Sequence, residues 1–131
     1  APKKPADLAR HAALVYSSVQ GDERWHFTGA TGTDGQTVSV PVKGPLRSNN
    51  LSVVLAAARA GLGVAVLPQY VAHESVKSGA VQPLLERWVL PAQEIHAVFP
   101  SPKLLPSKVR SLCDFLAPQF GEHWWEAAAL R

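Results

Sequence analysis

Cysteine and methionine are almost missing from this chain. Its 131 residues include one cysteine, Cys113, and no methionine. A single cysteine cannot form an internal disulfide, so we expect a reducing compartment, and the cytoplasm is the simplest one. Because the initiator methionine is missing too, we expect the chain to be a piece of a longer protein or a processed product.

Long apolar runs and clusters of one charge are also lacking. No apolar run approaches the roughly 20 residues that a helix needs to cross a bilayer, so no membrane partner is expected. Thirteen basic and ten acidic residues give a net charge of +3, and Lys3–Lys4 is the only adjacent basic pair. Nucleic-acid surfaces usually carry a clustered basic stripe. We therefore expect no direct binding of nucleic acid by this chain.

What the chain does have is the composition of a folded globular protein. Hydrophobic residues make up 47% and charged residues 18%, and the length suits one domain with a real core. β-branched and aromatic residues indicate three early strands, at 12–18, 24–29 and 37–48. The turn GDE (21–23) suggests that the first two form a hairpin. Pro41 indicates an edge or bulged strand, and Trp25 and Phe27 are expected in the core.

The clearest helix is expected over 51–60, LSVVLAAARA, which is dense in helix formers with apolar residues at helical spacing. Ser48, Asn49 and Asn50 are good N-caps, and Gly61 stands where a left-handed C-cap belongs. A short apolar strand, a helix, two strands and an amphipathic helix should follow, at 64–68, 69–79, 80–88, 93–99 and 107–120. This order predicts the α/β class, with a mixed sheet and helices on both of its faces.

The motif GLGVAVLP (61–68) superficially resembles a nucleotide-binding loop. A dinucleotide fingerprint needs the order strand, glycine turn, helix, so that a helix N-terminus faces the pyrophosphate. Here a helix comes first and a strand follows, and the partial negative charge of a helix C-terminus repels phosphate. We therefore expect no nucleotide cofactor. Gly61 should cap the helix, and Gly63 should let the strand backbone pass close to the helix above it.

Residues for covalent or metal chemistry do not gather in any recognisable pattern. No serine lies in a G-x-S-x-G context, and Cys113 falls on the apolar stripe of the last predicted helix, where a thiol is a small hydrophobe. The five histidines lack the spacing of metal ligands: His11, His26, His73, His96 and His123. The chain is therefore predicted not to be an enzyme, with no metal and no cofactor.

Residues 47–50, RSNN, indicate a different kind of site. Backbone N–H groups and polar side chains converge at the start of the helix that begins at residue 51. That arrangement suits an anion or a carboxylate-bearing ligand. Alternatively, Ser48 or Asn49 merely caps the helix. The residues alone leave both interpretations open.

The stretch GPLRSNNLSVVLAAARAGLGVAVLPQYVAHESVKSGAVQPLL resembles the effector-binding domain of LysR-type transcriptional regulators. Its features in order are a strand ending in NN, an alanine-rich helix, AGLGVAVLP, a helix ending in Lys-Ser-Gly, and VQPLL. PADLARHAALVYSS and RWHFTG before it, and IHAVFPSPKLLPSKVRSLCDFL after it, resemble the same family. The resemblance covers nearly the whole chain.

The resemblance implies two Rossmann-like subdomains, similar to type II periplasmic binding proteins, with a small inducer in the cleft between them. Residues 1–94 would form subdomain II, and residues 95–131 would be a returning strand and helix that belong to subdomain I. The rest of subdomain I and a winged helix-turn-helix domain, through which the regulator binds DNA, would precede residue 1. A homodimer or tetramer is expected.

The same resemblance places the inducer against the start of the helix. Ser48, Asn49 and Asn50 would face the cleft, and Pro45, Leu46 and Arg47 would form one wall. Arg47 would meet an inducer carboxylate, or it is a solvated surface arginine. The function implied is that of an inducer-binding fragment of a transcriptional regulator. A fragment of a periplasmic solute-binding protein, which shares the fold, is the alternative.

Overall fold

The structure is a computed structural model that describes residues 1–17, 23–29, 35–91, 96–99, 105–121 and 124. Contacts within the chain divide it into two compact units, residues 1–92 and residues 93–131. We call them unit 1 and unit 2, and each is described by itself. That unit 2 belongs to a different subdomain remains a prediction.

Unit 1 contains two three-stranded sheets, and its α/β class agrees with the prediction. Its elements are η1 (Pro5–Arg10), β1 (Ala13–Tyr16), β2 (Arg24–Gly29), β3 (Thr37–Pro41), β4 (Leu46–Ser48), α1 (Leu51–Arg59), β5 (Val64–Ala65), α2 (Gln69–Lys77) and β6 (Trp88–Val89). Sheet A is parallel, in the order β4-β1-β5, and sheet B is antiparallel, in the order β3-β2-β6.

The predicted hairpin between the first two strands is wrong. β1 lies at the centre of sheet A, whereas β2 lies at the centre of sheet B. Burial explains the separation. Ala13, Leu14 and Val15 are all buried, as in a parallel strand covered on both faces, while β2 alternates between exposed and buried residues. The turn proposed to join them lies mostly outside the described residues.

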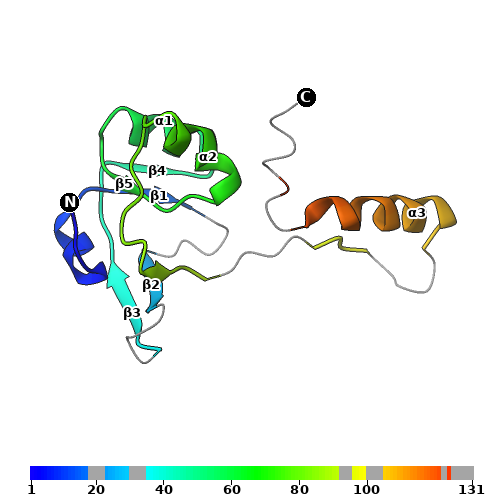
Figure 1. The fold of residues 1–131 in the computed structure, drawn as a ribbon, viewed down its shortest axis with the longest axis horizontal. Coiled ribbons are helices and arrows are strands. Elements are labelled where there is room, and N and C mark those ends of the chain that lie inside the picture. The colour runs from blue at the N-terminus through cyan, green and yellow to red at the C-terminus, as the bar shows by residue number, and fades with distance from the viewer. Residues whose placement is uncertain (18–22, 30–34, 92–95, 100–104, 122–123, 125–131) are drawn as a thin grey trace. The chain divides into compact units, whose positions relative to one another are not determined.

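The two faces of β1 lead to two hydrophobic clusters. Leu14 packs with Val54 and Ala57 of α1 on one face of sheet A. Val15 packs on the other face with a cluster that includes Trp25 and Phe27 of β2. Trp25 is 9% and Phe27 4% exposed, which confirms both as core residues. Figure 1 shows the result as layers, with α1 and α2 on one side of sheet A and β2 and β3 on the other.

Local signals set the limits of α1. The Asn50 side chain accepts a hydrogen bond from the backbone N–H of Ser52 (2.9 Å) and caps the first turn. At the other end, Gly61 has a φ of +74°, and its N–H donates to the carbonyl of Ala58. The next N–H, that of Leu62, reaches back to Ala57. This is the Schellman arrangement, so Gly61 is the C-cap that the sequence predicts.

Close backbone contacts explain two other glycines. A Cβ on Gly63 would collide with the backbone carbonyl of Ala12, so this glycine lets the chain pass the start of β1 rather than the helix. A Cβ on Gly44 would collide with the backbone of Ala13. Gly44 lies between β3 and β4, the two strands into which the predicted strand 37–48 divides. Pro41 ends β3, which is an edge strand as expected.

The two strands predicted after α2 are largely wrong. Residues 80–87 form no strand. In this part of the chain only the short strand β6 forms, and it pairs with β2. Leu85 has a φ of 57°, which an extended strand does not allow. Of the strand predicted at 93–99, residues 93–95 lie outside the described part, and residues 96–99 are not in a strand.

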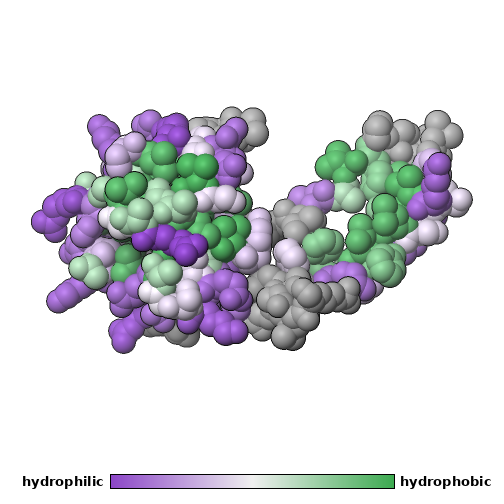
Figure 2. Space-filling view, turned by 90° about the horizontal axis from the view of Figure 1, so that it is seen from above, coloured by the Kyte–Doolittle hydropathy of each residue, from purple (hydrophilic) through white to green (hydrophobic). Residues whose placement is uncertain are grey.

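Unit 2 contains α3 (Ser107–Leu116), which continues into the 3₁₀ helix η3 (Ala117–Phe120). No residue of either helix is buried. Leu112 is 55% and Phe115 65% exposed, and Figure 2 shows hydrophobic side chains on the surface of this unit. Cys113 is half-buried and has no disulfide partner.

Candidate ligand-binding site

Strand ends and helix starts meet at one edge of sheet A. β1, β4 and β5 are parallel, so their carboxyl ends share an edge, and only two residues separate the end of β4 from the start of α1. The ladder continues past the strands, because the N–H of Ser17 donates to the carbonyl of Ser48 (2.9 Å). β4 and β5 lie on opposite sides of β1, so the connection through α1 crosses the central strand. In open α/β sheets, ligands bind at such a crossing, outside the carboxyl ends of the strands.

Two of the predicted site residues make local caps at this edge. The Ser48 hydroxyl accepts a hydrogen bond from the N–H of Asn50 (3.1 Å), and Asn50 caps α1 through Ser52. Of the three N-cap candidates, Ser48, Asn49 and Asn50, it is therefore Asn50 that caps the helix, and not Ser48 or Asn49. A cap leaves the hydroxyl hydrogen of Ser48 and the amide NH₂ of Asn50 available to a ligand.

Asn49 differs from its neighbours. Its side chain is exposed, and it makes no hydrogen bond or ion pair with any other residue in the described part of the chain. Asn49 stands between the end of β4 and the start of α1. Of the predicted site residues, it is the one whose side chain the local structure does not use.

Arg47 has a partner that the sequence analysis did not anticipate. Its guanidinium donates to the carboxylate of Glu23, the residue before β2, with an Nη2–Oε1 distance of 2.8 Å. Arg47 pairs with Val15 in the sheet register, on the face that packs against sheet B. Its neighbour Ser48 is on the opposite face because side chains alternate along a strand. Arg47 therefore points away from α1, and an anionic ligand would compete with Glu23 for it.

Leu46 also has a structural role. It is half-buried and packs against the cluster of Leu14, Val54 and Ala57 beneath α1. Pro45, just before β4, is exposed. Whether either residue borders a bound ligand stays a prediction.

Sequence reasoning missed two residues at this edge, Tyr16 and Ser17. Tyr16 ends β1 beside Ser48 in the register, and its side chain is 37% exposed. Ser17 follows and is half-buried. Their signal was available, because polar residues at the carboxyl end of a buried parallel strand mark the ligand edge. The predicted hairpin concealed that signal, because it placed this end in a turn.

The electrostatics of the edge favour a negative group. Neither α1 nor α2 carries an acidic residue in its first turn. The partial positive charges at the starts of α1 and α2 are therefore not neutralised by acidic side chains of these helices.

Groups of histidine, cysteine and carboxylates that could hold a metal ion do not occur among the described residues. No described helix is both long enough and apolar enough to span a membrane.

Comparisons with known proteins agree on one family. Residues 1–121 match the family described as the LysR substrate binding domain. The chain is 29% identical over 118 residues to the HTH-type transcriptional regulator PtxR of Pseudomonas aeruginosa, covering 90% of this chain and 36% of PtxR. It is 27% identical over 119 residues to the probable HTH-type transcriptional regulator LtrA of Klebsiella pneumoniae, covering 88% of this chain and 37% of LtrA.

Solved structures show the same relationship. The regulatory domain of AphB from Vibrio vulnificus is similar with a TM-score of 0.65 and 26% identity, over 89% of this chain and 56% of that one. The full-length virulence activator AphB of Vibrio cholerae matches with a TM-score of 0.58 and 25% identity, over 66% of this chain and 28% of that one. The chain therefore spans little more than a third of the curated relatives named above. With nearly its whole length matched and its fold shared, the chain belongs to the LysR substrate-binding domain family.

Proposed function

We propose that this chain is the inducer-sensing part of a LysR-type transcriptional regulator and that its ligand binds at the carboxyl edge of sheet A. The observation that carries the proposal is the meeting of three parallel strand ends with the start of α1, in a chain of this family. A small molecule there would contact Ser48, Asn49 and Asn50, with Tyr16 and Ser17 beside them. The family match also favours this function over that of a periplasmic solute-binding protein.

The ligand is expected to carry a carboxylate. Free N–H groups and the positive end of the α1 dipole meet there without an acidic side chain in the first turn. Arg47 takes a secondary place in this proposal because Glu23 already holds its guanidinium. The opposite wall of the cleft would come from the part of the regulatory domain that this chain does not span, since the chain covers 56% of the AphB regulatory domain.

Signalling would follow from closure of that cleft. An inducer that binds one arrangement of the two subdomains better than another shifts the population toward it. A dimer or tetramer would then pass the change to DNA-binding domains outside this chain. Such a regulator acts where the chromosome is, so we infer a cytoplasmic location. Catalysis has no part in the proposal.

The test is a screen of small organic acids against the longer regulator that contains this sequence. Thermal unfolding should show one acid that raises Tm in a concentration-dependent way, as expected for a ligand that binds only the folded state. The Asn49→Ala variant should lose that shift while keeping its Tm without ligand. Binding by neutral analogues as tight as by acids would contradict the carboxylate assignment. A shift unchanged in Asn49→Ala would contradict the site.

A further inference from the structure

A cavity lies in unit 1, away from the residues of the proposed inducer site. Its volume is about 630 Å³, and neither β4 nor Ser48, Asn49 or Asn50 lines it. It runs along the free edge of β5, between the end of α1, the inner face of α2, sheet B and the segment 80–85. Small-molecule sites commonly have volumes of about 300–1,000 Å³.

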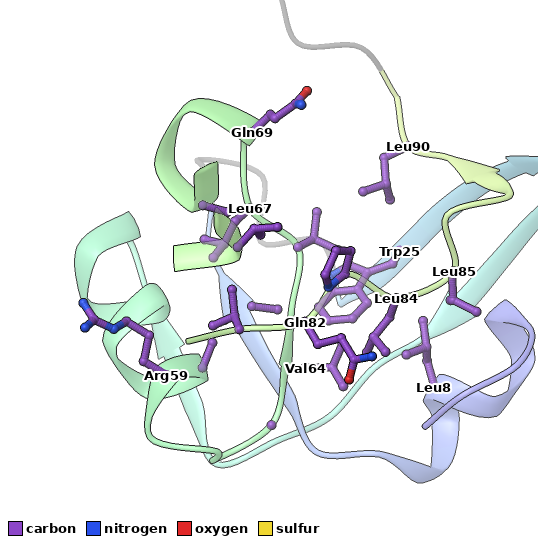
Figure 3. A pocket seen from close by; sticks show the side chains of 18 of the residues that line it. Leu8, Trp25, Arg59, Val64, Leu67, Gln69, Gln82, Leu84, Leu85 and Leu90 are labelled. Atoms are coloured by element: carbon purple, nitrogen blue, oxygen red, sulfur yellow. The ribbon is translucent and has the colours of Figure 1, made fainter. Parts of the chain in front are cut away.

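Apolar side chains from several separate parts of unit 1 form the walls. Figure 3 shows the labelled ones around a common space: Leu8, Trp25, Val64, Leu67, Leu84 and Leu90. Trp25 is 9% exposed and comes from β2, while Val64 is in β5. An aromatic ring beside aliphatic walls suits a ligand with an apolar body.

Four polar side chains line this cavity: Arg59, Gln69, His73 and Gln82. His73 Nε2 lies 3.8 Å from the carboxylate of Glu74, which does not line the cavity. Among the lining residues, all in the described part of the chain, there is no aspartate or glutamate, and Arg59 is the only permanently charged side chain. Arg59 lies at the outer edge, pointing away from the apolar walls, whereas Gln82 lies close to Val64 and Leu84 (Figure 3). Arg59 makes no ion pair with another described residue.

The backbone of β5 adds a donor at the same place. The N–H of Val64 donates to the carbonyl of Ala12, so Val64 faces β1. In a parallel ladder the next residue turns its N–H and C=O to the other side. Ala65 therefore directs its N–H to the free edge of sheet A, which borders the cavity.

We propose that this cavity binds an amphipathic monocarboxylate, with its apolar body against Trp25 and Leu84 and its carboxylate toward the rim with Arg59. Arg59 at the outer edge of the cavity is positively charged, and no lining residue is acidic, so an anion should bind in preference to a cation. All the residues that line this cavity belong to unit 1. The proposal does not depend on the inducer site.

The experiment titrates the whole chain with decanoate, with decylammonium as the probe of opposite charge and the same apolar body. Binding is followed by tryptophan fluorescence, since Trp25 forms part of the wall, and by amide chemical shifts in NMR spectra. We expect decanoate to bind at least tenfold more tightly than decylammonium. Shifts should centre on Val64, Ala65 and Gln82.

Two variants locate the site. Ala72→Phe on α2 would fill the cavity, because Ala72 lines it, and should weaken decanoate binding at least tenfold. Ala56→Phe is the matched control, because Ala56 is exposed on α1 and does not line the cavity. It should bind decanoate like the unmodified chain. Arg59→Gln should weaken decanoate binding about two- to fivefold, the usual effect of an exposed charge pair, and leave decylammonium binding unchanged or tighter.

Several results would overturn the proposal. Equal binding of decanoate and decylammonium would remove the charge argument, and decanoate binding unchanged in folded Ala72→Phe would remove the cavity. Shifts confined to α3 would show that decanoate adsorbs to the exposed apolar face of unit 2 instead. That NMR result needs no variant, so it decides the question even if Ala72→Phe does not fold.

Discussion

Asn49 and Asn50 are identical neighbours with different surroundings. The Asn50 side chain caps α1, whereas the Asn49 side chain is exposed and uncommitted among the described residues. Replacing Asn50 by alanine should lower the free energy of unfolding by about 1 kcal/mol, while Asn50→Asp should keep the cap. Asn49→Ala should change it by less than about 0.5 kcal/mol. Urea unfolding of the three variants measures the difference, and equal losses at both positions would contradict the capping geometry.

The same pair separates structure from sensing in the longer regulator. Changing both residues to alanine should abolish induction while DNA binding persists, because the proposed inducer site lies in this chain and the DNA-binding domain is expected outside it. Asn49→Ala alone should already weaken induction without loss of stability. A reporter assay with a parallel DNA-binding assay provides the measurement. Normal induction in a folded double variant would remove these residues from the site.

Gly44 and Gly121 make a matched pair for close backbone packing. A Cβ on Gly44 would collide with the Ala13 backbone, where the N–H of Ala13 donates to the carbonyl of Lys43 (2.9 Å), whereas a Cβ on Gly121 would meet nothing within 4 Å. Gly44→Ala should destabilise the chain by about 1–3 kcal/mol, the usual cost of forcing a backbone shift in a packed region. Gly121→Ala should be close to neutral. Equal midpoints in urea unfolding would show that the chain before β4 adapts freely.

At the scale of elements, α3 is an amphipathic helix without a buried residue. Val109 and Cys113 on its apolar stripe are half-buried, while Leu112, Phe115 and Leu116 are exposed. Burial of each large apolar side chain is worth about 1.5–3 kcal/mol. In the family, the corresponding helix is expected to pack on subdomain I, and this chain covers just over half of the AphB regulatory domain. We therefore expect the stripe to pair with a second copy of the chain.

Sedimentation velocity at tens of micromolar should show a dimer or larger species. Changing Leu112 and Phe115 to serine should shift it to monomer, because both side chains lie on the exposed stripe. Val53→Ser, which also removes an exposed apolar side chain but from α1, should leave association unchanged. A clean monomer in which Cys113 does not react with a thiol reagent would mean that α3 is covered within its own chain.

At the scale of the whole molecule, the chain should not recognise DNA by itself. No part of its sequence resembles a recognition helix, and its basic residues are dispersed rather than clustered. Fluorescence anisotropy with promoter DNA should show at most weak binding that disappears as salt rises, because such binding is to phosphates alone. A salt-resistant preference for one promoter sequence would contradict the assignment to the regulatory part of the protein.

The sequence by itself determined what depends on near neighbours. The caps of α1, the apolar strand after Gly61 and the helices α2 and α3 all arise from signals a few residues apart. The family resemblance arises from the order of such local motifs along the chain. The polar start of α1 was predictable for the same reason. The sequence did not determine which of the two asparagines caps the helix.

Only the tertiary structure decided what depends on distant partners. It placed β1 and β2 in different sheets, paired Arg47 with Glu23 across 24 positions, and left residues 80–87 outside any strand. It also brought Leu8, Trp25 and Leu84 to one cavity. The physical reason is that strand pairing, ion pairs and cavities depend on which segments meet in space. An apolar run of a few residues suits a central strand, an edge or a loop equally well until its neighbours are known.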